Sequence, residues 1–356
     1  GYDPGKAWPL LLLAHGQHGS GQSILRAFTG LLGRDLEKYI VVAPSLPGIR
    51  KYSGRPYQEQ TFLKPLLWTC RNLNVDDNRV YVSGYSLGGS TSWHLATMFP
   101  RHLAGAVPMA GVPFFEGGLA TMLMYLENLS NLPVWAIWGE LDKAKPGHLG
   151  NRDLCRMGTA RLTELKNPHY RGTELEGKGH GGAWPTSAAF VKFLASHTRN
   201  AVPTKIEWRF HLAHHSRGYY LDAVELARKP EEFRFERQIP IRLPPGEKPT
   251  DENVMKAFRE YFRKRLFKMS GELRPAENTV TVRATSVRKL RLYVMDGMVD
   301  PAKPVKIAYW DRPWQGEVPV SAKCMLLNYA ARRDQSALVL NEIDLKPTLK
   351  PVIRFK

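Results

Sequence analysis

The first 200 residues alternate short apolar runs with longer mixed stretches, and this alternation limits the possible folds more than any other feature. The runs are bounded by turn residues and have the length of buried strands. Strands are expected at 10–14, 39–43, 80–83, 103–108 and 133–138, with a weaker one near 172–176. Helices are expected between them, at 22–33, 58–73, 90–99, 117–130, 151–166 and 185–197. Strands that alternate with helices predict an α/β architecture, a mostly parallel sheet with helices on both faces.

The pattern changes after about residue 200. Thr250 can cap a helix whose apolar face holds Val254, Phe258, Tyr261, Phe262 and Leu266, with Gly271 closing its end. Beyond it, apolar residues occupy every second position in 280–284, 290–294 and 305–309, which indicates short strands. We therefore expect an α/β domain at 1–200 and a C-terminal α+β domain at 201–356 that contains a small antiparallel β-sandwich.

The chain is strongly basic, with 51 Lys and Arg against 33 Asp and Glu and a formal net charge of +18. Such a surplus favours acidic polymers or anionic surfaces as partners. The basic residues are interspersed with acidic ones and no nucleic-acid motif is present, so we expect a basic soluble surface and no nucleic-acid partner. The longest apolar run, Leu10–Ala14, is far too short to span a membrane. Three widely spaced cysteines match no metal-ligand spacing and do not suggest a disulfide framework.

One stretch, RVYVSGYSLGG at 79–89, carries a candidate nucleophile. Ser86 lies on the turn between the expected strand and the expected helix, with Gly84 two residues before it and Gly88 two residues after it. A sharp strand-to-helix turn exposes the serine hydroxyl at the carboxyl edge of a sheet. The N–H of Leu87, at the start of the helix, would then point to where an oxyanion forms.

Three other segments supply the groups that such a serine requires. HGQHGS at 15–20 follows the first strand and can offer a second oxyanion donor, the N–H of Gln17, with His15 and His18 bracing the loop. GELD at 139–142 follows a late strand, and Asp142 is the expected acid, with Glu140 and Asp153 as alternatives. GKGHGG at 177–182 places His180 in a flexible loop, where it can act as the general base.

The chain order of Ser86, Asp142 and His180 resembles that of the α/β-hydrolases. The lead-in YDPGKAWPLLLLAHG is similar to that of the esterase branch related to polyhydroxybutyrate depolymerases and feruloyl esterases. The resemblance implies a bacterial serine esterase that needs no cofactor or metal and acts on small-molecule or polymeric esters. It also favours a secreted or periplasmic location. Such enzymes usually have one or two strands before the lead-in, so we expect either that an upstream segment with these strands is missing or that the sheet is shorter than usual.

Substrate contacts are expected near the nucleophile. Tyr85 and Trp184 flank the serine and histidine motifs, and Phe114 and Phe115 lie in the apolar segment 112–131. That segment either lines an acyl or aromatic-acid pocket or packs as a cap helix.

Two other activities stay open. A prolyl-oligopeptidase-like peptidase would use the same three residues on an amide bond. A non-catalytic protein would instead use the basic 201–356 region to bind an acidic polysaccharide.

Two clusters after residue 200 also have two interpretations. His211, His214 and His215 suggest a metal site, but only His211 and His215 have helical spacing and the metalloprotease glutamate is absent, so we expect no metal. The aromatic residues of AYWDRPWQG at 308–316 either form a sugar-binding platform or close the end of a hydrophobic sandwich.

Overall fold

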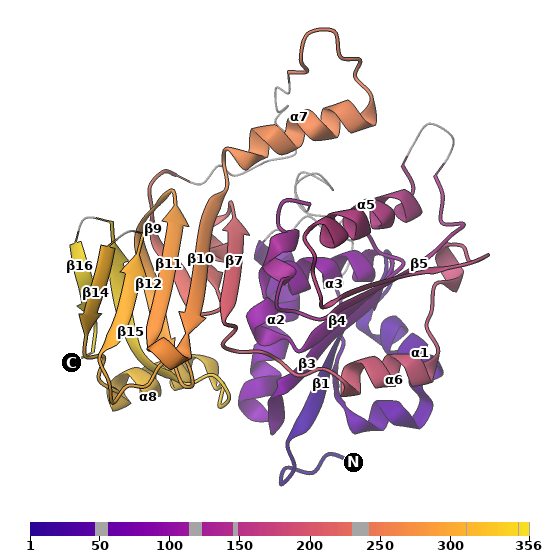
Figure 1. The fold of residues 1–356 in the computed structure, drawn as a ribbon. Helices are drawn as coiled ribbons and strands as arrows, with labels where there is room; N and C mark the ends of the chain where they lie inside the picture. The colour runs from indigo at the N-terminus through magenta and orange to yellow at the C-terminus, as the bar shows by residue number, and fades with distance from the viewer. Residues whose placement is uncertain are drawn as a thin grey trace. The chain divides into compact units, whose positions relative to one another are not determined.

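The computed structural model describes residues 1–46, 56–113, 123–144, 149–229, 242–310, 312–347 and 349–355. The chain divides into two compact units, one formed by Gly1–Arg199 with Phe233–Phe262 and the other by Asn200–Glu232 with Arg263–Lys356 (Figure 1). The helix α7 (Asp251–Arg263), expected as part of the C-terminal region, thus falls almost entirely in the first unit.

The first unit is built on a parallel six-stranded sheet with the order β2-β1-β3-β4-β5-β6. Its strands are β1 (Trp8–Ala14), β2 (Ile40–Val42), β3 (Val75–Tyr85), β4 (Gly105–Met109), β5 (Val134–Gly139) and β6 (Tyr170–Leu175). Leu10 to Leu13 are at most 1% exposed, as expected for a strand covered on both faces. The predicted parallel α/β sheet is therefore confirmed.

Helices cover both faces of this sheet (Figure 1). They are α1 (Gly21–Leu32), α2 (Pro56–Asn72), α3 (Leu87–Met98), α5 (Asn151–Glu164) and α6 (Ser187–Ala195). Phe28 of α1 and Phe190 of α6 share one core cluster with Leu11 and Leu13 of β1, so these two helices lie on the same face. The helix α3 packs on β3 and β4 and is buried over nearly its whole length, which brings its N-terminus to the carboxyl edge of the sheet.

The expected helix at 117–130 is not an α-helix where it is described. Only the short 3-10 helix η3 (Leu126–Leu129) forms there, and 114–122 lie outside the described residues.

The second unit contains two five-stranded sheets, with the orders β14-β13-β11-β10-β7 and β16-β15-β12-β9-β8. The strands of the first are β7 (Lys205–Phe210), β10 (Phe267–Arg274), β11 (Thr279–Thr285), β13 (Val305–Tyr309) and β14 (Arg312–Gly316). Those of the second are β8 (Arg217–Gly218), β9 (Leu221–Leu226), β12 (Val287–Met295), β15 (Val339–Lys346) and β16 (Leu349–Ile353), and α8 (Ala322–Arg332) follows β14. Buried side chains of both sheets form one core cluster. All pairings are antiparallel except that of β11 with β13, which is parallel.

The helix that was expected to run to Gly271 ends at Arg263 instead. From Phe267 the chain is the strand β10, whose alternating buried side chains pair it with β7 and β11. Gly271 closes no helix; a Cβ there would lie 2.8 Å from the Tyr220 ring, so the glycine makes room for that side chain. Strand pairing, with its period of two, thus outweighed the helical spacing that Leu266 continues.

Among the described residues, every helix is too short or too polar to cross a bilayer.

Candidate active site

The turn between β3 and α3 holds Ser86 in a strained conformation. Its φ of 59° and ψ of −120° are unusual for a residue with a side chain. Two backbone hydrogen bonds fix it there: its N–H donates to Met109 of β4 at 2.9 Å, and its carbonyl accepts from the N–H of Ser90 at 3.0 Å. The Ser86 backbone is therefore held by the sheet through its N–H and by the helix through its carbonyl.

Glycines allow the backbone segments around this turn to approach closely. A Cβ on Gly88 would lie 1.9 Å from the carbonyl oxygen of Ala14, and one on Gly89 would lie 2.3 Å from that of Met109. A Cβ on Gly84 would come within 2.5 Å of the Gly88 carbonyl oxygen. The pattern GYSLGG therefore fits the N-terminus of α3 against β1 and β4, which a Cβ at any of these three positions would prevent.

His180 lies between Ser86 and Asp142. Its Nε2 is 2.8 Å from Ser86 Oγ, and its Nδ1 is 2.7 Å from Asp142 Oδ2. An ionised carboxylate only accepts hydrogen bonds, so Nδ1 carries the proton and Nε2 accepts from the serine hydroxyl. The side chain of Asp142 is 11% exposed and that of His180 is 44% exposed, so the carboxylate is largely shielded while the imidazole faces solvent.

The geometry distinguishes the three candidate carboxylates. Glu140 accepts a hydrogen bond from the N–H of Gly177 at 3.0 Å, which ties the end of β5 to the histidine loop. Asp153 accepts from the N–H of Gly150 at 3.0 Å and from Arg152, and these hydrogen bonds, that from Arg152 first, lower its pKa. Asp142 alone of the three reaches His180.

Asn151 is a site residue that the sequence did not suggest. It is the first residue of α5, and its side-chain amide donates to Asp142 Oδ2 at 3.1 Å. The same nitrogen is 3.3 Å from His180 Nδ1. No motif surrounds it; its place directly after the acid-bearing loop was the one available signal.

The loop after β1 lies against the serine. A Cβ on Gly16 would be 3.5 Å from Ser86 Cβ and 3.3 Å from the carbonyl oxygen of Tyr85. His15 is 7% exposed; its Nε2 accepts from the N–H of Leu46 at 2.9 Å, and its Nδ1 donates to the Gly16 carbonyl at 2.8 Å. Gln17 follows directly and is exposed.

Tyr85 and Trp184 stack on each other, with ring centroids 4.3 Å apart and an interplanar angle of 9°. The Tyr85 hydroxyl donates to the backbone carbonyl of His180 and accepts from the N–H of Ala183 at 3.2 Å. Burial raises the pKa of Tyr85, so the hydroxyl stays protonated and able to donate. These contacts brace the histidine loop. Substrate contact by either ring stays a prediction, while Phe114 and Phe115 lie outside the described residues.

The histidines after residue 210 do not form the helical pair that was considered. The strand β7 ends at Phe210, and the short 3-10 helix η5 comprises only Ala213–His215, so His211 and His215 do not share a helix.

Comparisons with known proteins give similarity over part of the chain. No family model matches. The 30 kDa subunit of magnesium chelatase from Rhodobacter capsulatus is 34% identical over 133 residues; the match covers 36% of this chain and 44% of that protein, less than half its length.

Among solved structures, a thermostable esterase is 22% identical with a TM-score of 0.45, over 56% of this chain and 57% of that one. A phospholipase/carboxylesterase from Dyadobacter fermentans is 16% identical with a TM-score of 0.40, over 51% and 86%. A ferulic acid esterase from Anaeromyces mucronatus is 17% identical with a TM-score of 0.41, over 55% and 81%. The first unit itself, with a parallel sheet flanked by helices and a strand–serine–helix turn after β3, has the fold of the α/β-hydrolases.

Proposed function

We propose that the chain is a serine hydrolase that cleaves carboxylic esters, with its chemistry in residues 1–200. The observation that carries the proposal is the hydrogen-bonded series from Ser86 through His180 to Asp142. A serine hydroxyl is a weak nucleophile, and an adjacent base that is itself oriented by a third group activates it. The strained conformation of Ser86 supports the proposal, because such strain clusters at functional sites.

In the first step, Ser86 Oγ attacks the ester carbonyl carbon while His180 Nε2 takes the hydroxyl proton. Asp142 holds the Nδ1 proton in place and stabilises the imidazolium that forms. The 11% exposure of Asp142 strengthens this stabilisation, because a shielded charge is less screened than one in water.

The negative charge that develops on the carbonyl oxygen needs donors. The N–H of Leu87 belongs to the first turn of α3, where helix geometry leaves it without an intrahelical acceptor. The N–H of Gln17 is the proposed second donor, supported by the closeness of the preceding Gly16 to Ser86. One such donor is worth about 10²–10³ in rate.

Collapse of the tetrahedral intermediate releases the alcohol, which takes its proton from His180, and leaves the acyl group on Ser86. His180 then removes a proton from water, which attacks the acyl carbon. As this second tetrahedral intermediate collapses, His180 gives the proton to Ser86 Oγ and the acid is released. Apart from the ester and the attacking water, every group used in these steps belongs to this chain.

A substrate panel on one preparation tests the proposal. We expect p-nitrophenyl esters to be hydrolysed and amino-acyl p-nitroanilides not to be. Ser86→Ala should abolish ester turnover, while Ser336→Ala, the same change at an exposed serine of the second unit, should leave it unchanged. Anilide turnover without ester turnover would instead support a peptidase. No turnover of either class, together with binding of an acidic polysaccharide, would support a non-catalytic binding protein.

A further inference from the structure

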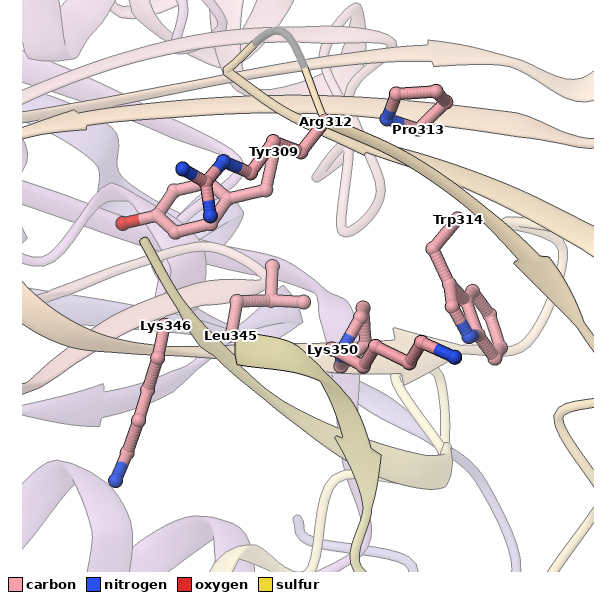
Figure 2. Close-up of a pocket in the computed structure, with 8 residues that line it drawn as sticks. Tyr309, Arg312, Pro313, Trp314, Leu345, Lys346 and Lys350 are labelled. Atoms are coloured by element: carbon pink, nitrogen blue, oxygen red, sulfur yellow. The ribbon is translucent and has the colours of Figure 1, made fainter. Parts of the chain in front are cut away.

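The second unit has a pocket of about 210 Å³ that plays no part in the chemistry described above (Figure 2). It lies between β14 and β16, the outermost strands of the two sheets. Two aromatic rings, an aliphatic side chain and three cationic ones line most of it, namely Tyr309, Trp314, Leu345, Arg312, Lys346 and Lys350.

The fold holds the aromatic part of the pocket in place. Trp314 is half-buried and packs on the core of the unit, and it pairs across the hairpin with Ile307. Its indole lies over Gly316, where a Cβ would be only 2.4 Å from the ring. Any other residue at 316 would push the indole away. Gly316 thus leaves room for the indole, and packing on the core holds the ring before a ligand arrives, which reduces the ordering cost of binding.

Every charged side chain among the described residues that line the pocket is cationic. Arg312, Lys346 and Lys350 are exposed, and within the described part of the chain none of the three forms an ion pair. The neighbouring Asp344 already pairs with Lys289 at 2.8 Å and Arg291 at 2.9 Å. A ligand with a negative charge would therefore meet cations that no carboxylate of the described residues neutralises. Figure 2 shows the Lys350 side chain extending toward Trp314, so one cation and the indole bound the same space.

From this combination we propose that the pocket binds a sugar ring that bears a carboxylate, a uronic acid unit. The C–H face of a pyranose packs on the indole, and the carboxylate accepts hydrogen bonds from the amine of Lys350, which extends toward Trp314 (Figure 2), while Arg312 adds positive charge to the pocket. The volume is below the roughly 300 Å³ at which drug-sized ligand pockets begin, which suits a single ring. An isolated phosphate would use the cations but leave the indole uncovered, and a neutral sugar would use the indole but leave the cations unpaired.

Binding to the full chain is measured by calorimetry, with trigalacturonic acid as the probe. Galacturonic acid shows whether the free monosaccharide binds or a unit within a polymer is needed. A neutral galactose trisaccharide measures the contribution of the carboxylate. Inorganic phosphate measures the contribution of stacking on the indole. We expect the trigalacturonate to bind, the neutral trisaccharide and phosphate to bind at least about tenfold more weakly, and salt to weaken binding. Equal binding of the neutral trisaccharide or of phosphate would overturn the proposal, as would no binding of either acid.

Matched variants locate the site. Lys350→Gln and Trp314→Ala should each weaken trigalacturonate binding about fivefold or more. The controls Lys323→Gln on α8 and Trp310→Ala, whose indole is 45% exposed and does not line the pocket, should leave it unchanged. Because Trp314 also packs on the core, the binding result for Trp314→Ala is interpreted only if this variant melts like the parent. If it does not, the result for Lys350→Gln, at an exposed position, is used alone. Unchanged binding in Lys350→Gln would refute the assignment. Because the probe contains no ester, binding can be present when hydrolysis is absent, and the reverse.

Discussion

The contact between Gly88 and β1 makes a quantitative prediction about the elbow. Ala14 is fully buried, and a Cβ on Gly88 would lie 1.9 Å from its carbonyl oxygen, 2.5 Å from its carbonyl carbon and 2.9 Å from the His15 carbonyl oxygen. Separations below 3.0 Å essentially never occur for a Cβ, so Gly88→Ala must move the backbones of β1 and α3 apart by about 1.1 Å. All three obstructing atoms are backbone, and no side-chain rotation relieves them.

Two consequences follow from that displacement. Overpacking of a buried site costs about 1–3 kcal/mol, and the absence of a side-chain escape places Gly88→Ala near the upper end, which for a unit of this size lowers the Tm by roughly 6–12 °C. The shift also separates the N–H of Leu87 from the loop that carries Gln17. A misplacement of about 1 Å at reacting groups costs about 10² in rate.

Thermal unfolding and ester kinetics on the same preparations check both numbers. Gly30→Ala is the matched control, since Gly30 is an exposed position inside α1 and a Cβ there meets nothing within 4 Å. It should stabilise the chain by about 0.5–1 kcal/mol and leave kcat/KM unchanged. A Gly88→Ala chain with the parent Tm and the parent kcat/KM would refute the close packing of β1 against the elbow.

Three further predictions concern the groups around the site and the thiols. Asp142→Asn keeps the shape but no longer fixes the His180 tautomer, so kcat should fall by about 10³–10⁴ with the Tm little changed; a fall below tenfold in steady-state kinetics would contradict this role. Tyr85→Phe removes the hydroxyl that braces the histidine loop, and we expect a lower kcat/KM with unchanged ester preference; full activity would show that the brace is dispensable. Burial raises the pKa of Cys155 strongly and that of Cys324 to about 11, so at pH 8 both should resist iodoacetamide until the chain unfolds; rapid native alkylation in a mass-spectrometric time course would contradict the burial.

Much of the first unit was predictable because its local residue patterns agree with the burial that the fold requires. The run Leu10–Leu13 is apolar throughout, as a doubly covered strand must be, and the helix after Ser86 follows its strand without a gap. The glycines of the elbow were also predictable, because only glycine, which has no Cβ, allows a neighbouring backbone atom to lie 2–3 Å from the Cβ position.

The choice among the carboxylates was not decided by sequence. Glu140 and Asp142 directly follow β5 and Asp153 lies in the first turn of α5, and only the path of the loop between them shows which one faces His180. Asn151 was missed for a related reason: a helix start at 151 was predicted, but nothing in the local residue pattern shows that the side-chain amide at this position faces Asp142.

The boundary between α7 and β10 was predicted wrongly because two periodicities overlap there. Leu266 continues the spacing of the helical face, while Phe267, Met269 and Leu273 have the spacing of two that a strand requires. The pairing of this segment with β7, sixty residues earlier in the chain, is a long-range interaction that local pattern does not contain.

Fluorophosphonate labelling read by peptide mass tests whether Ser86 is a nucleophile activated by His180. We expect one label, on the peptide that contains Ser86, and a labelling rate at least about 10³-fold lower in His180→Ala. A label on any other residue, or an undiminished rate in His180→Ala, would contradict it.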